Sequence, residues 1–274
     1  MAPAELPRDL VGLAVMVLLL GVRHGFDADH LAAIDGLTRY NAPARPWLAR
    51  WCGALFSLGH GGVVLAVALG VSLLAQAWVP PGWLQALGAW LSIAMLTALA
   101  LLNITAVLRT PGHQTAHLAG WRSGVFAGLL HAGSPLGVMG VGLLFALSFD
   151  TVSQAALFAV TASQFGGWQP ALLLAGLFIA GMLLSDGLNG WCISRLIHRA
   201  DQTARVASRV MTLAVSGVGL LTAGLGAASQ LLQGVDGWAQ GKGLWFASAI
   251  CVVLLLSFVV GQHLAAVRPV AACR

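Results

Sequence analysis

Six ionisable residues lie within thirteen positions of the first long apolar stretch: Arg23, His24, Asp27, Asp29, His30 and Asp35. A charge at the centre of a bilayer costs about 3 kcal/mol on insertion scales, so such a cluster needs partners or a function. Imidazole and carboxylate groups together suit divalent nickel, cobalt, zinc, iron or manganese, and the lack of a thiolate in this cluster argues against Cu(I). We therefore predict a metal site in this cluster, with His24, Asp27 and His30 as its candidate ligands.

The spacing of these residues sets a geometric condition on the helix that carries them. In a straight helix His24, Asp27 and His30 form one stripe, and Asp29 points to the other side. The two histidines would lie ~9 Å apart along the axis, which is too far for both to bind one ion through bonds of about 2 Å. Either the helix is bent or broken near Gly25, or the site uses part of the stripe together with a second helix.

His60 offers a ligand from a second apolar segment, where it stands between Gly59 and Gly61. Glycines at these positions allow another backbone to approach closely. A single histidine inside a membrane is more often a hydrogen-bond partner between helices than a metal ligand. Both interpretations stay open for His60 at this point.

Further polar residues in or beside apolar segments are interpreted as lining a path for the ion: Asp35, Asp150, Gln154, Asp186 and Asn189. Two of them have plainer alternatives. Asp35 stands four residues before Arg39 and is suited to an ion pair on one helix face. Asp150 lies at the end of an apolar segment, where an acid could simply be close to water.

The composition requires lipid as the solvent for these segments. The chain has 274 residues, of which 58% are hydrophobic and 8% are charged, whereas soluble domains average about 25% charged residues. We predict an all-α, polytopic membrane helix bundle that forms a single transmembrane domain over residues 1–274. Its seven spans lie near 10–34, 50–76, 83–108, 121–149, 170–197, 208–232 and 242–267. A shorter apolar segment over 151–165 is predicted to be a re-entrant or interfacial helix.

Arginine-rich connections alternate with connections that hold almost no charge. The basic connections lie near residues 35–50, 109–122 and 195–209, and the tail after residue 268 is also basic. Seven spans preserve this alternation and an eighth would break it. By the positive-inside rule the N-terminus lies outside and the C-terminus in the cytoplasm, as in a bacterial inner-membrane protein.

Several other functions are disfavoured by the sequence. The net charge of +5 comes from residues between apolar segments, so nucleic-acid binding is not expected. Residues 237–243 only approximate a phosphate-binding loop, which argues against an ATPase on this chain. Neither HExxH nor GxSxG is present, so the remaining enzyme alternative is an intramembrane metal-dependent hydrolase. No cofactor is expected beyond a transported ion. The expected partners are that ion and membrane lipid, and no oligomeric state is indicated.

Four segments resemble the signature motifs of the nickel/cobalt transporter (NiCoT) family of secondary permeases. They are RHGFDADHLAAID at 23–35, FSLGHGGVV at 56–64, LSFDTVSQ at 147–154 and GMLLSDGLN at 181–189. The first is similar to RHAxDADHI, which contains HX4DH. The resemblance implies uptake of Ni²⁺ or Co²⁺, with His24, Asp29 and His30 at the selective site and His60 near it.

Three departures from the family pattern bear on this expectation. The HX4DH segment lies in the first span here, whereas it lies in the second of eight in typical members. Gln154 stands where the family has Glu, and Gly187 and Asn189 replace Thr and Asp. The sequence does not choose between nickel and cobalt, and a metal exporter with the same ligands remains an alternative. The working hypothesis is that the ion enters from outside near Asp150, Gln154 and Asp186. It then passes to the histidine cluster, closer to the cytoplasm.

Overall fold

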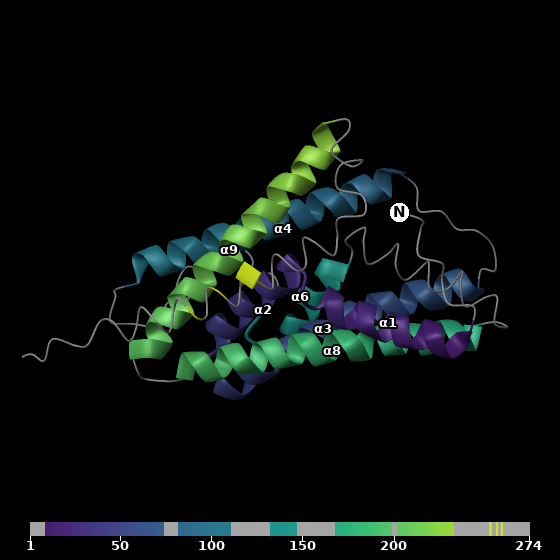
Figure 1. The fold of residues 1–274 in the computed structure, drawn as a ribbon, viewed down its shortest axis with the longest axis horizontal. Coiled ribbons are helices and arrows are strands. Elements are labelled where there is room, and N and C mark those ends of the chain that lie inside the picture. The colour runs from purple at the N-terminus through teal and green to yellow at the C-terminus, as the bar shows by residue number, and fades with distance from the viewer. Residues whose placement is uncertain are drawn as a thin grey trace, which may run out of the picture.

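A computed structural model describes residues 9–73, 82–110, 132–146, 168–198 and 202–232, together with Val252, Val253, Leu256 and Val259. All regular structure within these residues is helical, as predicted (Figure 1). The helices are α1 (Leu10–His24), α2 (Ala28–Asn41), α3 (Pro46–Leu73), α4 (Gly82–Arg109), α6 (Pro135–Ala146), α8 (Trp168–His198) and α9 (Gln202–Leu231).

Four of the described helices contain a segment long and apolar enough to cross a membrane: Pro46–Leu73, Ala86–Arg109, Trp168–Arg195 and Arg209–Leu231. The pair α1 and α2 together would make a fifth span, bent by 54° at its break. These five correspond to the predicted first, second, third, fifth and sixth spans. The polytopic membrane helix bundle is therefore confirmed.

The remaining predicted segments are described in part or not at all. The short apolar helix α6 lies within the predicted fourth span, at 121–149. The predicted helix over 151–165 lies outside the described residues, as does the predicted span over 242–267 apart from four single residues. The count of seven spans stays a prediction.

The helix that carries the end of the first predicted span continues past residue 34. α2 continues from Ala28 to Asn41, so only residues 42–45 connect it to α3. Asp35 and Arg39 follow residue 34, where the predicted span ends. In the structure these two side chains form an ion pair on one helix face, so the helix continues through them in a buried environment.

Among the described helices, α3 and α8 pack against each other most extensively, and they run antiparallel. At one end, Val64 and Ala68 of α3 pack with Ala171 and Leu174 of α8. At the other end, Ala49 of α3 packs with residues 193 and 197 of α8. α1 packs beside α8 at the first of these ends, and α4 pairs with α9 on the far side of the bundle (Figure 1).

Two glycines of α3 allow neighbouring backbones to come into direct contact. A Cβ atom at Gly53 would overlap the carbonyl of Asp186 in α8. A Cβ atom at Gly59 would overlap the carbonyl of Met139 in α6. The close approach predicted around His60 is thus present at Gly59, where α6 contacts α3. The corresponding contact of α8 with α3 lies at Gly53.

α2 occupies the middle of the bundle. It contacts α3 and α8 on one side and α4 and α9 on the other (Figure 1). Every side chain from His30 to Arg39 is buried. The break that precedes α2 therefore lies inside the protein, where three helices meet.

Candidate metal centre

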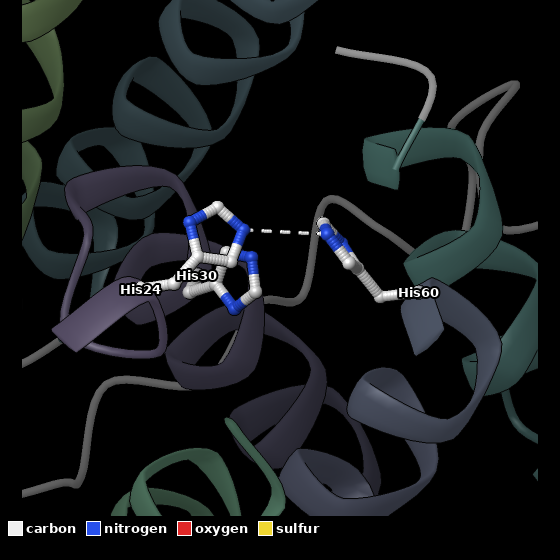
Figure 2. A group of neighbouring side chains, drawn as sticks. All are labelled: His24, His30 and His60. Atoms are coloured by element: carbon white, nitrogen blue, oxygen red, sulfur yellow. Dashed lines mark hydrogen bonds between the residues drawn. The ribbon is translucent and has the colours of Figure 1, made fainter. Parts of the chain in front are cut away.

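Three histidines converge at the break between α1 and α2. His24 ends α1, His30 lies in the first turn of α2, and His60 lies near the middle of α3 (Figure 2). Their ring centroids are 4.6 Å apart for His24 and His30, 5.2 Å for His24 and His60, and 4.7 Å for His30 and His60. One potential ligand atom from each residue lies within 4.8 Å of the other two.

The break over residues 25–27 is what brings His24 and His30 together. A straight helix would separate them by ~9 Å along its axis, whereas the 54° bend leaves their rings in contact. The predicted irregularity near Gly25 is confirmed. A Cβ atom at Gly25 would lie 2.1 Å from Ser185 Oγ and 2.8 Å from Asp186 Oδ1. Glycine therefore lets α8 approach the break closely.

Two carboxylates are hydrogen-bonded to the Nδ1 atoms of His24 and His30, which are called the outer nitrogens below. Asp27 Oδ2 lies 2.9 Å from Nδ1 of His24, and Asp186 Oδ2 lies 2.9 Å from Nδ1 of His30. When Nδ1–H donates to a carboxylate, Nε2 keeps its lone pair and can bind a metal. Nε2 of His30 has no hydrogen-bond partner among the described residues. The Nε2 atoms of His24 and His60 are 3.3 Å apart, along the dashed line in Figure 2.

The two carboxylates differ in their surroundings. The Asp27 side chain is 42% exposed, whereas Asp186 and His30 are completely buried. Asp27 precedes the first residue of α2, where backbone N–H groups of the first turn attract negative charge. Asp186 has no such environment, and it depends on the hydrogen bonds of its neighbours.

Three other predicted site residues, Asp29, Asp35 and Asn189, are among the described residues. Asp29 accepts a hydrogen bond from the backbone N–H of His30 at 3.0 Å. Asp35 accepts hydrogen bonds from Nε of Arg39 at 2.8 and 3.0 Å, which confirms the alternative of an i, i+4 pair. Asn189 is partly buried one turn beyond Asp186. Asp150 and Gln154 lie outside the described residues.

Ser57 is a residue of the centre that sequence reasoning missed. Its Oγ lies 2.6 Å from Asp186 Oδ2 and 3.1 Å from the carbonyl of Gly53. The single hydroxyl proton faces the nearer and charged acceptor. Ser57 stands three residues before His60, on the same face of α3. That spacing was the available signal, but the acceptor lies 129 positions away in the chain.

Two buried phenylalanines enclose the cluster along the bundle axis. The ring of Phe178 lies 5.3 Å from His24, and the ring of Phe56 lies 4.9 Å from His30. Phe178 precedes Asp186 by two turns of α8, and Phe56 precedes His60 by one turn of α3. Because α3 and α8 are antiparallel, the two aromatic rings lie toward opposite ends of the bundle.

The cluster lies near the middle of the helices that carry it. His60 is ~20 Å from either end of α3, at 1.5 Å of rise per residue. The sequence predicts a site closer to the cytoplasm, because the predicted first span ends at residue 34. α2 extends to Asn41, so the break falls in the middle of the α1–α2 pair.

Comparison with known proteins decides what kind of chain carries this centre. The family model described as high-affinity nickel-transport protein matches residues 10–265. The chain belongs to this family. The match includes every residue of the centre, and it confirms the resemblance drawn from the four motif segments. Since this is a family of transporters, the hydrolase alternative is set aside.

Individual relatives are 29–32% identical to the chain over the aligned residues. The high-affinity nickel transport protein of Cupriavidus necator is 29% identical over 268 residues, covering 82% of this chain and 74% of that protein. The cobalt transport protein NhlF of Rhodococcus rhodochrous is 32% identical over 248 residues, covering 79% and 70%. The nickel transporter NixA of Staphylococcus aureus is 32% identical over 212 residues, covering 66% and 60%. No solved structure matches the chain.

Proposed function

We propose that this chain is a secondary permease that takes up nickel or cobalt ions, and that His24, His30 and His60 bind the ion during its passage. The observation that carries the proposal is the meeting of three buried imidazoles at a helix break in a chain of the nickel-transport family. Discontinuous helices around a site near mid-depth are a recurrent construction in secondary transporters.

The distances between the rings fit one bound ion. Two nitrogens bound at about 2.0–2.1 Å to a tetrahedral ion are ~3.3 Å apart. The Nε2 atoms of His24 and His60 already have this separation, at 3.3 Å. His30 needs only a small rotation, because all three ligand atoms lie within 4.8 Å. A fourth position remains for water or for a group that moves in.

The charges around the rings also fit a divalent ion. Three neutral imidazoles bring no charge, while Asp27 and Asp186 each place a carboxylate on an outer nitrogen. Together they can balance a charge of two without binding the ion directly. In this arrangement the carboxylates orient and polarise the histidines. Asp29, which the family resemblance put at the selective site, would serve the ion from the first turn of α2.

The described residues also support an orientation in the membrane. Arg45 and Arg50 lie at the start of α3, and Arg195 lies near the end of α8, stacked 4.1 Å above the ring of Trp191. Exposed Trp47 and Trp51 lie at the same end, as in an interfacial aromatic belt. We propose that this end faces the cytoplasm of a bacterial cell and that the start of α1 faces outward.

This orientation gives the direction of transport. An inside-negative potential favours the inward movement of a divalent ion by about 4.6 kcal/mol per 100 mV, twice the value for one charge. We propose that Asp150 and Gln154 serve the outer part of the path, and that Asn189 serves the inner part beyond Asp186. Movements of Phe178 and Phe56 would open the two sides in turn.

Uptake of radiolabelled nickel into proteoliposomes, with an imposed inside-negative potential and a known protein orientation, tests the proposal. The unaltered protein is expected to accumulate nickel, and His24→Ala, His30→Ala and His60→Ala are expected to abolish accumulation. Ser216→Ala serves as the control, because Ser216 is buried in α9 and hydrogen-bonds only within its own helix as far as the described contacts show. Full uptake by all three histidine variants would refute the proposed site, and net export would refute the direction.

A further inference from the structure

We propose that Asp186, held in place by Ser57, is the positioning carboxylate of the metal centre. It orients the ring of His30 so that Nε2 faces the ion, and its charge favours a divalent over a monovalent cation. This inference rests on the proposed function, because it assumes that the ion binds at the three histidines. It gives Asp186 a role beside the centre in place of the expected role at the outer end of the path.

The geometry around Asp186 carries the first step. Its Oδ2 atom lies 2.9 Å from Nδ1 of His30 and 2.6 Å from Oγ of Ser57. The imidazole and the hydroxyl thus donate to the same oxygen from two different helices, α2 and α3. A carboxylate that accepts Nδ1–H fixes both the tautomer and the orientation of a metal-binding histidine.

Burial carries the second step. Asp186, Ser57 and His30 are each 0% exposed. A carboxylate in this environment has lost its hydration and needs compensating charge nearby. Arg39 of α2, the one buried arginine among the described residues, is already engaged with Asp35 through its Nε. A divalent cation at the three rings would place positive charge next to this buried carboxylate.

The second oxygen of Asp186 adds a third observation. Oδ1 is buried and has no hydrogen-bond partner among the described residues. It lies against Gly25, since a Cβ atom there would be 2.8 Å away. The carboxylate of Asp186 therefore lies between Gly25 at the break and Ser57 of α3. One of its oxygens is bonded to neighbouring helices, and the other is not. A role that only joined helices would not require a charged group with one oxygen left over.

The test compares binding of Ni²⁺ and Co²⁺ to purified full-length protein in detergent. Asp186→Asn keeps an acceptor for His30 but removes the charge, and Ser57→Ala removes the second donor. Asp186→Asn is expected to weaken nickel binding by about 10- to 100-fold, the range typical of outer partners of metal-binding histidines. Ser57→Ala should cause a smaller loss. Ser216→Ala is the matched control, since Ser216 is equally buried and donates to a carbonyl of its own helix.

Two further measurements separate positioning from simple structural support. The visible bands of bound Co²⁺ should shift in Asp186→Asn, because they report the arrangement of the ligand nitrogens. In the double variant, Ser57→Ala should add no more than about a twofold loss, because Ser57 acts through Asp186. A purely structural role would lower the melting temperature of the metal-free protein and leave the Co²⁺ bands unchanged.

The outcomes distinguish this inference from the function on which it rests. If the unaltered protein binds neither ion, the proposed function is wrong. If it binds both, but Ser57→Ala and Asp186→Asn bind like Ser216→Ala with unchanged Co²⁺ bands, the positioning role is wrong. Should Asp186→Asn fail to fold, Ser57→Ala decides alone, by its nickel affinity and its Co²⁺ bands.

Discussion

The Nε2 atoms of His24 and His60 lie 3.3 Å apart, although they come from different helices. One residue ends α1 at the break, and the other lies in the continuous helix α3. The separation equals that of two nitrogens bound to one tetrahedral ion, ~3.3 Å. The two helices therefore already hold these rings at binding distance, and the remaining adjustment falls on His30.

The first prediction concerns the third ring. His60→Gln keeps a polar side chain of similar size and removes the imidazole. Substitution of a residue that only hydrogen-bonds to a ligand weakens metal binding by about 10- to 100-fold. Loss of a direct ligand such as His60 should weaken nickel binding by more than this. Equilibrium dialysis with nickel measures this loss, and the circular dichroism of the variant checks that it folds. Unchanged nickel affinity would show that His60 is a hydrogen-bond partner between helices and not a metal ligand.

A second prediction concerns the glycine at the break. Gly25→Ala places a methyl group against Ser185 and Asp186, and overpacking of this kind typically costs about 1–3 kcal/mol. The displaced carboxylate would turn the ring of His30, so nickel affinity should fall as well as stability. Gly62→Ala is the control, because a Cβ atom there meets no other group within 4 Å. Equal nickel affinity in the two variants would contradict the proposed close fit.

A third prediction concerns the buried ion pair of Asp35 and Arg39 in α2. Asp35 and Arg39 are each 2% exposed and are joined through Nε of the arginine. Asp35→Asn leaves Arg39 without its carboxylate, and breaking a buried pair in this way costs about 3–5 kcal/mol. The double variant Asp35→Leu with Arg39→Met should recover much of this loss, because it removes both charges. Thermal unfolding in detergent measures both effects, and a stable Asp35→Asn protein would show that the pair contributes little.

A fourth prediction concerns the choice of metal. A centre whose direct ligands are imidazole nitrogens suits nickel, cobalt and zinc, whereas magnesium and calcium prefer oxygen ligands. Unlabelled cobalt and zinc should therefore compete with radiolabelled nickel for uptake, and a large excess of magnesium or calcium should not. Strong competition by magnesium would indicate that carboxylate oxygens of Asp27 or Asp29 bind the ion directly.

Local spacing was sufficient to predict some of these features. The distance between His24 and His30 along a straight helix left two possibilities, a break near Gly25 or a second helix, and the structure shows the break together with His60 from α3. Hydropathy predicted the five spans that the described residues contain. In both cases the information lies within one helix, where the rise per residue converts sequence separation into distance.

Other features depend on contacts between distant segments. The bond from His30 to Asp186 joins residues 156 positions apart, and that from Ser57 to Asp186 joins residues 129 positions apart. Their proximity follows from the register of α8 against α2 and α3, which no local pattern specifies. The continuation of α2 past residue 34 likewise depends on a contact that hydropathy does not show. Asp35 and Arg39 look like residues at a water interface, but they neutralise each other inside the bundle.

The most direct test of the account is anomalous scattering at the nickel edge from crystals soaked with nickel. The account predicts one strong peak bounded by the Nε2 atoms of His24, His30 and His60, with Asp27 and Asp186 on the outer nitrogens. A peak on the carboxylates of Asp27 and Asp29, away from His60, would contradict it. A fully occupied nickel peak elsewhere in the chain, with the rings of His24, His30 and His60 in unchanged positions and without an ion, would also contradict it.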